Sequence, residues 1–480
     1  MKRILGLLLV GLLLALALEG SAQVYERIIQ PGENLYQAVR DIPRGSISDF
    51  KVMAGIYTNG VTNLFMNGRW HFNGATLRLI DIPTNTSGAG IFDDRFSGAV
   101  TCAITGTLEI QYTPGTNVWV DPADLVNGYN TNALAAIVVT NRKSYILMDA
   151  SIKAGIYGIA PKPKVLYVDD CATNSSFGRF DNVYFWKPDS AFLSNGVFNV
   201  MLRTNHLGVA DLYAEIGSSF LRWNEGTMHC RAGNVYVTDY ALDCYNSKTN
   251  ATALFFTADV VSGKAYIVGR TNTWKVWATV KEWQNPNTFN GNAFNFFGAG
   301  SHYIQAMKMS AAVSETIRLE SPNTAGDSNL VVWVNIDKVS GSNGWVNVLH
   351  GSLRGRIGHF EWNGPSASTV VGLNCTNVSA FVSLSGENMP ADYTAVVHGG
   401  GRMELFNYLI WSTNRSPVFL AADGLKLVST VLRPSSSASN SIIAQSAQNV
   451  RLYGNVIGRV AAHANVTATV GTMVVDADTD

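Results

Sequence analysis

Hydrophobic and polar residues alternate with a period of two in short runs along most of the chain. Examples are residues 146–154, 235–238, 276–281, 332–336 and 450–453. Such alternation places successive side chains on opposite faces of an extended strand, so that one face is buried and the other meets water. No long helical pattern separates the runs. The sequence therefore predicts an all-β chain of many short strands.

One amphipathic helix is predicted near the start of the chain. Its apolar residues fall at i, i+3, i+4 and i+7, which gives a single stripe on one face. Pro43 and Gly45 end the helix, and a strand follows at residues 50–57. The stripe consists of Leu35, Ala38, Val39 and Ile42.

Two architectures accommodate many short strands without crossover helices, namely antiparallel sandwiches and a β-solenoid. Asn-Gly and Asp-Gly hairpin turns are few, and many strand partners are separated by one Gly, as at Gly269 and Gly454. So small a corner bends a strand without reversing it, which favours the solenoid. In a solenoid the backbone of each coil bonds to the coils above and below.

The segment 33–41, followed by the strand at 50–57 with Ala54-Gly55 before an aromatic residue, resembles the opening of pectin-lyase-like proteins. The match covers about residues 30–60. The resemblance implies a right-handed parallel β-helix with a short N-terminal capping helix. That family includes secreted polysaccharide lyases and hydrolases, and also phage tailspikes and adhesins. Fold alone does not choose among these functions.

The N-terminus resembles a secretory signal peptide. Lys2 and Arg3 precede an apolar run at 4–18, and small residues lead to a cleavage site after Ala22. An uncleaved N-terminal anchor is the alternative. We expect a secreted protein, extracellular or at the cell surface, or on the virion surface if it is viral. The expected parts are a signal peptide at 1–22, a helical cap at 23–48, a β-helix at 49–433, and a Ser-rich linker with a β-rich end at 434–480.

Composition and charge narrow the function classes. Of 480 residues 47% are hydrophobic and 15% charged, and 35 basic side chains balance 35 acidic ones. This composition excludes a disordered chain and gives no electrostatic reason to expect nucleic acid or an acidic membrane as partner. The five cysteines leave at least one unpaired thiol. Cys230 and Cys244 either bridge neighbouring strands or are buried free thiols.

The densest group of chemically active side chains lies at 350–362. If Leu353 and Ile357 point inward, the two arginines beside them point outward, and a bend at Gly358 shifts the phase so that the following His and Glu are also outside. Arginine pairs with sugar carboxylates, and His or Glu serves as general acid or base. The alternative is a solvated face with local ion pairs. The candidate catalytic residues are Arg354, Arg356, His359 and Glu361.

Other catalytic signatures are missing from the sequence. There is no nucleotide-binding loop, no GxSxG elbow and no HExxH, and no cofactor or metal is predicted. The acid pairs Asp93-Asp94 and Asp169-Asp170 are adjacent residues that point to opposite faces of a strand, so each needs a partner from another coil. Hydrolases of the resembled family carry a series of motifs that includes Arg-Ile-Lys. The similar segment of this chain, Arg356-Ile357-Gly358, lacks the Lys. This disfavours a polygalacturonase.

Outward aromatic residues provide a second functional signal, because aromatic rings are platforms for sugars. Parity along the strands places Tyr184, Trp186, Tyr236, Tyr240, Trp277, Trp283 and Trp333 on outer faces. Coverage of these rings by loops or by identical subunits is the alternative. The predicted substrate-binding residues are Trp277, Trp283, Trp333, Tyr236 and Tyr240.

The leading hypothesis is an extracellular β-helix protein that binds a polysaccharide or cell-surface glycan along its flank, with cleavage left open. The alternative is a non-catalytic virion tailspike, fibre or surface structural protein for receptor attachment, with a homotrimer as its assembly. A third hypothesis is a non-catalytic adhesin or envelope component. The signal peptide favours a cellular protein, and the missing catalytic series favours binding or structure over catalysis.

Overall fold

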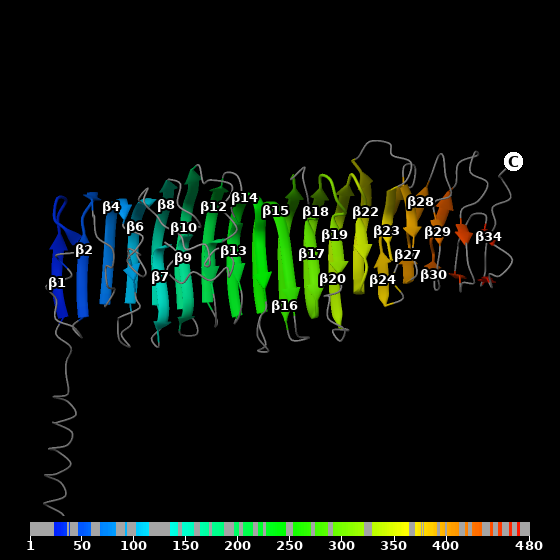
Figure 1. Ribbon diagram of the computed structural model, residues 1–480, viewed down its shortest axis with the longest axis horizontal. Coiled ribbons are helices and arrows are strands. Elements are labelled where there is room, and N and C mark those ends of the chain that lie inside the picture. The colour runs from blue at the N-terminus through cyan, green and yellow to red at the C-terminus, as the bar shows by residue number, and fades with distance from the viewer. Residues whose placement is uncertain are drawn as a thin grey trace, which may run out of the picture.

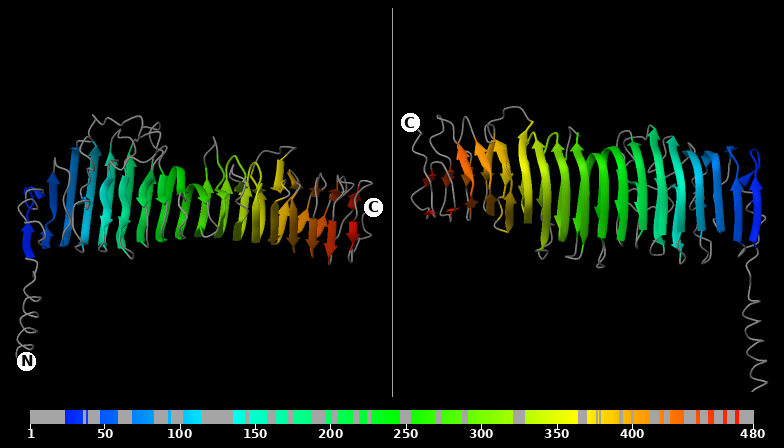
Figure 2. Two further views of the ribbon diagram at one scale, coloured as in Figure 1. Left: turned by 60° about the horizontal axis from the view of Figure 1, so that its bottom comes forward. Right: turned by 180° about the vertical axis from the view of Figure 1, so that it is seen from behind.

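The computed structural model describes residues 24–35, 38, 47–58, 68–82, 92–93, 102–114, 135–142, 146–157, 164–171, 175–186, 196–200, 205–214, 219–223, 227–245, 253–269, 274–286, 291–320, 329–363, 370–375, 377, 379–390, 394–398, 401–411, 418–420, 425–433, 442–444, 450–453, 460–462 and 468–470. They are nearly all in β-strands, as the alternation predicts. Figure 1 shows the strands side by side along the long axis of the molecule, in chain order from blue to red, and Figure 2 shows the same order from two further sides.

The strands of the first half of the chain are β1 (Val24–Ile29), β2 (Ile47–Val52), β3 (Gly55–Thr58), β4 (Gly68–Ile82), β5 (Phe92–Asp93), β6 (Cys102–Pro114), β7 (Ala135–Arg142), β8 (Ile146–Tyr157), β9 (Lys164–Cys171), β10 (Ser175–Trp186), β11 (Gly196–Val200), β12 (Asn205–Ala214) and β13 (Ser219–Trp223). The central strands are β14 (Thr227–Tyr245), β15 (Ala253–Gly269), β16 (Lys275–Asn285), β17 (Phe294–Gly298), β18 (Gly300–Ala311), β19 (Ile317–Glu320), β20 (Leu330–Gly341), β21 (Val346–Val348), β22 (Gly351–Trp362), β23 (Val370–Asn374), β24 (Ala380–Ser385) and β25 (Asn388–Pro390). The last strands are β26 (Thr394–His398), β27 (Arg402–Phe406), β28 (Leu409–Trp411), β29 (Val418–Leu420), β30 (Leu425–Val428), β31 (Val431–Arg433), β32 (Ile442–Ala444), β33 (Val450–Tyr453), β34 (Val460–Ala462) and β35 (Ala468–Val470).

The strands pair in parallel, each with the strand one turn of the chain earlier and the strand one turn later. One ladder runs through β14, β15, β16, β18, β20, β22, β24, β27, β30, β33 and β35. A second runs through β15, β17, β19, β21, β23 and β26. Parallel pairing between described strands excludes the antiparallel sandwich for this part of the chain. It is consistent with a β-helix or solenoid.

The large sheet contains 32 strands, and a separate sheet of 3 strands contains β29, β32 and β34. The first ladder continues through β33 and β35, beyond the boundary expected at residue 433. The Ser-rich segment 434–441 lies outside the described residues.

Inward side chains of successive coils stack on one another to form the core. In β16 the alternating residues Val276, Ala278 and Val280 are buried, as the sequence predicts. The registers place Val280 against Ala306, and Ala306 against Ile336. Each large apolar side chain buried in this way contributes about 1.5 to 3 kcal/mol to folding.

The coils bend at a corner where two consecutive side chains point outward. In β16 Val280 is buried, Lys281 and Glu282 point out, and Trp283 is buried again. This doubled outward step reverses the parity of the strand beyond it. The equivalent outward pairs are Asp259 and Val260 in β15, Met307 and Lys308 in β18, and Asp337 and Lys338 in β20. The corner repeats in register from coil to coil.

The predicted capping helix is not shown by the structure. Leu35 and Ala38 are buried, and the Ala38 N–H donates to the Asn34 carbonyl oxygen over 3.0 Å. Val39 and Ile42 lie outside the described residues. Among the described residues no helix is long and apolar enough to cross a membrane.

Candidate functional site

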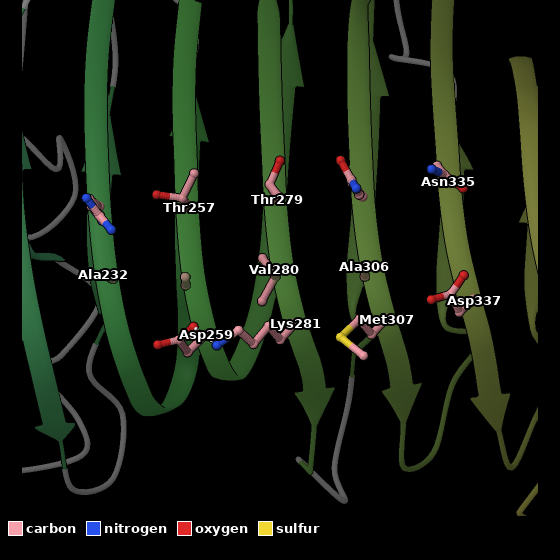
Figure 3. Close-up of a pocket in the computed structure, with 13 residues that line it drawn as sticks. Ala232, Thr257, Asp259, Thr279, Val280, Lys281, Ala306, Met307, Asn335 and Asp337 are labelled. Carbon is pink, nitrogen blue, oxygen red and sulfur yellow. Dashed lines mark ion pairs between the residues drawn. The ribbon is translucent and has the colours of Figure 1, made fainter.

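An open groove of about 580 Å³ runs across the outer face of β14, β15, β16, β18 and β20, just before the corner. We call the outward face of these strands and of β22, up to the corner, the groove flank. Figure 3 shows the lining side chains arranged in two rows that cross the strands. One row holds Arg231, Thr257, Thr279, Gln305 and Asn335, and the corner row holds Asp259, Lys281, Met307 and Asp337.

The rows exist because the strands stack without a shift in register. Thr257 pairs with Thr279, Thr279 with Gln305, and Gln305 with Asn335. Parallel strands lie about 4.8 Å apart, so the groove offers one hydroxyl or amide side chain at each such step. Between the rows the groove is bounded by Ala232, Ala258, Val280 and Ala306, whose side chains are buried in the core.

Both acids that line the groove are paired with cations of the next coil. Lys281 Nζ lies 2.6 Å from Asp259 Oδ1, and Arg356 Nη1 lies 2.9 Å from Asp337 Oδ1. All four side chains are substantially exposed. Exposed pairs of this kind contribute at most about 1 kcal/mol each, so their main effect is to neutralise the corner.

An aromatic column stands beside the groove on the same flank. Its members pair in register and are His229, Phe255, Trp277, Tyr303 and Trp333. The rings of His229 and Phe255 stack at 4.6 Å and 8°, and those of Phe255 and Trp277 at 4.7 Å and 5°. In a stack the faces of neighbouring rings contact one another, so that the ring edges meet solvent. Trp333 is 46% exposed, the most open of the described tryptophans.

The predicted group at 350–362 has the inward and outward pattern that the sequence predicts. Leu353, Ile357 and Phe360 are buried, and the phase changes at Gly358. Gly355, between the two arginines, has φ +128°, and a Cβ there would lie 2.0 Å from the Val334 carbonyl oxygen. Only glycine fits at that position.

The four candidate catalytic residues have different partners in the structure. Arg356 bridges Asp337 and Glu387, the latter over 3.0 Å, and these hydrogen bonds raise the pKa of Arg356. Glu361 instead pairs with Lys338 over 2.7 Å. Arg354 turns to the aromatic column, with its guanidinium carbon 5.7 Å from the Trp333 ring centroid.

His359 is held by two partners. Its Nε2 lies 3.1 Å from Glu387 Oε2, and its Nδ1 lies 3.2 Å from Asn388 Nδ2. A carboxylate accepts and an amide NH₂ donates, so in a neutral ring the proton sits on Nε2 and the Nδ1 lone pair faces Asn388. Glu387 joins His359 to Arg356 and carries no sequence signal of its own. The catalytic role of these residues stays a prediction.

The placement of Trp283 on an outer face is wrong. Trp283 is 0% exposed, and its Nε1–H donates to the Gly263 carbonyl oxygen over 2.8 Å. The corner is the cause, because two outward residues in succession, Lys281 and Glu282, turn the next side chain inward. If strict alternation continued through the corner, Trp283 would lie on the outer face.

The other predicted aromatic residues differ in how open they are. Trp277 is half-buried and stacked on Phe255. Tyr236 and Tyr240 are also half-buried, and Lys264 Nζ lies 4.0 Å from the Tyr240 ring centroid. The side chains of Tyr184 and Trp186, and of the acid pairs at 93–94 and 169–170, lie outside the described residues.

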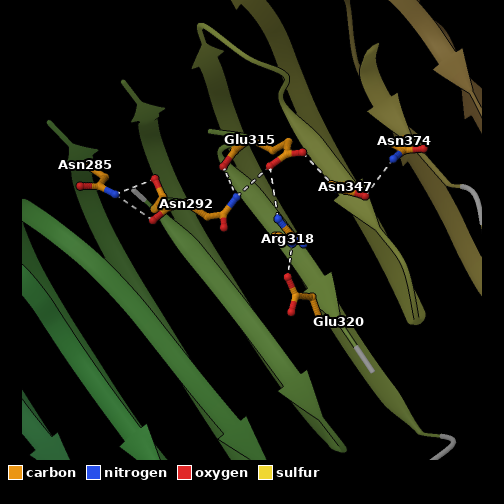
Figure 4. Close-up of polar contacts among 8 residues, drawn as sticks. Asn285, Asn292, Glu315, Arg318, Glu320, Asn347 and Asn374 are labelled. Atoms are coloured by element: carbon orange, nitrogen blue, oxygen red, sulfur yellow. Dashed lines mark hydrogen bonds and ion pairs between the residues drawn. The ribbon is translucent and has the colours of Figure 1, made fainter. Parts of the chain in front are cut away.

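A second polar array lies on another side of the molecule, along β17, β19, β21 and β23 and the residues that lead into them. We call it the asparagine flank (Figure 4). Asn292 Nδ2 donates to the Glu315 carbonyl oxygen over 2.6 Å, and Asn347 Nδ2 donates to Glu315 Oε1 over 3.0 Å. Asn374 Nδ2 in turn donates to Asn347 Oδ1 over 3.1 Å. The sequence does not predict this array, because the signal for it is no more than an Asn near each of several strand ends.

Three of the five cysteines have described side chains, and these three are free thiols. Cys230, Cys244 and Cys375 are buried, and burial raises the pKa of each, that of Cys375 to about 12. The disulfide between Cys230 and Cys244 is thereby ruled out in favour of the buried-thiol alternative. No group of His, Cys, Asp and Glu side chains suited to a metal ion occurs in the described part of the chain.

In comparisons with known proteins, no family model and no curated protein matches this chain.

Proposed function

We propose that this protein binds an elongated polysaccharide in the groove, with the chain of the ligand parallel to the stack of coils. The observation that supports this most directly is the in-register row of Thr257, Thr279, Gln305 and Asn335 along the groove. A surface that repeats at every coil fits a ligand that itself repeats. A glycan is such a polymer.

The chemistry of the groove suits sugar units. Hydroxyl and amide side chains both donate and accept hydrogen bonds, which matches the hydroxyl groups along the edge of a sugar ring. The Met307 side chain, which lines the groove and is 61% exposed, suits the apolar ring faces. If each coil binds one sugar unit, the weak contacts of several coils together give a measurable affinity.

We propose binding without cleavage. Glycoside hydrolysis commonly needs two carboxyl groups that flank the scissile bond. Both acids lining the groove, Asp259 and Asp337, are paired with Lys281 and Arg356. His359 has its two nitrogens engaged by Glu387 and Asn388. The candidates for cleavage remain Arg354, Arg356, His359 and Glu361, and absence of product from any bound glycan is our expectation.

The finer architecture is part of the same proposal. We infer that the parallel ladders close into a right-handed β-helix of the pectin-lyase-like kind, with a helix around 33–42 as its cap. The buried Leu35 and Ala38, and the hydrogen bond from Ala38 to Asn34, support that cap. Export through the N-terminal signal peptide would place the glycan-binding flank outside the cell.

A tailspike, fibre or other surface structural protein is the second candidate. It is favoured by two exposed apolar side chains on the groove flank, Met307 at 61% and Trp333 at 46%. A second copy of the chain in a homotrimer would cover such side chains. Sedimentation of the purified protein separates the two functions, because a trimer that buries this flank would leave the groove closed to a glycan.

Binding is tested by calorimetric titration of the mature protein with a panel of linear polysaccharides, together with an assay for new reducing ends. We expect Thr279→Val and Gln305→Ala to weaken binding about tenfold each, because each removes hydrogen bonds made by one coil. Gln284→Ala is the matched control, since Gln284 lies on the far side of the corner and does not line the groove. Equal affinities for all three variants and the unchanged protein would rule out the groove as the site.

A further inference from the structure

The charges of the groove flank do not cancel. Its two acids, Asp259 and Asp337, are each neutralised by a cation of the next coil, Lys281 and Arg356. Three further basic side chains of β14, β16 and β22 form no ion pair with any described residue. They are Arg231, Lys275 and Arg354.

Arg354 is the most constrained of these three cations. Its guanidinium carbon lies 5.7 Å from the Trp333 ring centroid and 5.0 Å from the Phe381 ring centroid. Its Nε is buried and has no hydrogen-bond partner among the described residues. Contact with two rings fixes the plane of the guanidinium and shields it from water, while its terminal nitrogens have no carboxylate to bind.

Arg356 provides a direct contrast on the same strand. It lies two residues further along β22 and points to the same side, yet Asp337 and Glu387 occupy its guanidinium at 2.9 and 3.0 Å. Two carboxylates leave it no capacity to attract another anion. Of the two arginines, only Arg354 offers an uncompensated positive charge to a ligand.

The unpaired cations lie at different coils of the groove flank. Arg231 lines the first coil of the groove. The other two lie beside the groove against the aromatic column: Lys275 Nζ is 5.7 Å from the Trp277 ring centroid, and Arg354 pairs in register with Trp333. Five steps of coil separate Arg231 from the coil of Arg354. At about 4.8 Å for each step this is about 24 Å, the length of several sugar units.

We propose that the ligand of the groove is an anionic polysaccharide, and that Arg354 determines this specificity by binding a carboxylate or sulfate group of the polymer. The inference rests on the proposed glycan-binding function and specifies its substrate class. A planar guanidinium binds either group through two parallel hydrogen bonds. Arg231 and Lys275 add attraction along the chain, so binding weakens as salt is raised.

The test compares linear glycans that share a backbone and differ only in charge: the neutral polymer, its carboxylated form and its sulfated form. We expect the unchanged protein to bind one or both charged forms at least about tenfold more tightly than the neutral form at low salt. Arg354→Gln should lose about tenfold in affinity for the charged form and leave affinity for the neutral form unchanged. Arg354→Lys keeps the charge but not the fork, and should fall between.

Arg318→Gln is the matched control, with the same change of charge on the asparagine flank, where Arg318 pairs with Glu320 and does not line the groove. It should change the affinity for the charged form by less than about threefold, because a partly exposed charge on another side of the molecule is screened by salt. Equal affinity for neutral and charged forms would overturn this inference and leave the glycan-binding function standing. Equal losses in Arg354→Gln and Arg318→Gln would also overturn it, because net charge would then explain the preference. Binding to none of the three forms, nor to other glycans, would overturn both proposals.

Discussion

The groove flank and the asparagine flank are built on the same stack of coils and treat their polar side chains in opposite ways. On the asparagine flank the amides of Asn292 and Asn347 bond to Glu315, and Asn374 bonds to Asn347. On the groove flank Thr257, Thr279, Gln305 and Asn335 face an open groove, and Arg354 has no acidic partner. The amide NH₂ groups of Asn292, Asn347 and Asn374 are bonded within the fold, whereas the row on the groove flank is left for a ligand.

This difference distinguishes polar side chains that stabilise the fold from polar side chains that are available to a ligand. Buried polar groups must find partners within the fold, because each unsatisfied group costs about 1 to 3 kcal/mol. An exposed group has water as its partner and can exchange it for a ligand. A cluster of polar residues is therefore evidence of a binding site only where its members do not already bind one another. By that criterion Arg356 belongs to the structure and Arg354 to the site.

The largest expected effect contrasts the buried Trp283, which lies beyond the corner, with the exposed Trp333 on the groove flank. Trp283→Ala removes a side chain that contacts the rings of Phe256 and Phe294, and should lower the free energy of unfolding by about 3 to 5 kcal/mol. Trp333→Ala should change it by less than about 1 kcal/mol and weaken glycan binding instead. Guanidinium chloride unfolding measures both. A similar loss of stability in the two variants would remove the distinction between core and flank.

A smaller effect is expected on the asparagine flank. Asn347→Ala leaves Glu315 Oε1 without its donor and Asn374 Nδ2 without its acceptor, and should lower the free energy of unfolding by about 2 to 3 kcal/mol. Affinity for the glycan should be unchanged. Thr279→Val should have the opposite effect: it should weaken glycan binding and leave the free energy of unfolding unchanged. If Asn347→Ala reduced binding while leaving stability intact, the asparagine flank would itself be a ligand site.

The last effect is absent at neutral pH and concerns His302, a polar side chain buried beneath the groove flank. His302 is 1% exposed, has no hydrogen-bond partner among the described residues, and burial lowers its pKa from 6.5 to about 3. Between these values the unfolded chain binds the proton and the folded chain does not. The stability that depends on a neutral His302 is therefore fully present above about pH 6.5. As pH falls from 6.5 towards 3, the free energy of unfolding decreases by at most about 1.4 kcal/mol for each pH unit.

His302→Leu should remove that part of the acid sensitivity, and thermal melts between pH 4 and 7 measure it. His359→Gln is the control, because His359 is half-exposed and bonded to Glu387. An unchanged pH profile in His302→Leu would show that His302 takes up its proton without cost to the fold.

Much of the fold could be predicted from alternation alone. The buried sides of β16 and β20 follow directly from Val276, Ala278 and Val280 and from Val332, Val334 and Ile336. The phase change at Gly358 was also predictable, because a glycine interrupts the pattern there. The corner after Val280 was not, since Lys281 and Glu282 carry no turn signal, and this placed Trp283 on the wrong face.

The candidate site was predictable only in part. Its residue types were visible, and Arg354, Arg356, Trp277 and Trp333 do lie on the groove flank. Their partners were not visible, because Glu387 reaches Arg356 from the next coil, 31 positions along the chain. The groove was missed for the same reason, since Thr257, Thr279 and Gln305 are ordinary outward residues of separate strands until the register aligns them.

The sequence by itself determined that the chain is all-β, low in charge, and alternates so as to bury one side of each strand. These properties depend on each residue and its near neighbours, which the period of the pattern records. Only the tertiary structure decided which outward side chains meet, because every row and ion pair on the groove flank joins residues of different coils. The same register that pairs Arg356 with Asp337 leaves Arg354 between two rings without an acid. That placement, rather than the residue type, distinguishes a candidate binding residue from a structural one.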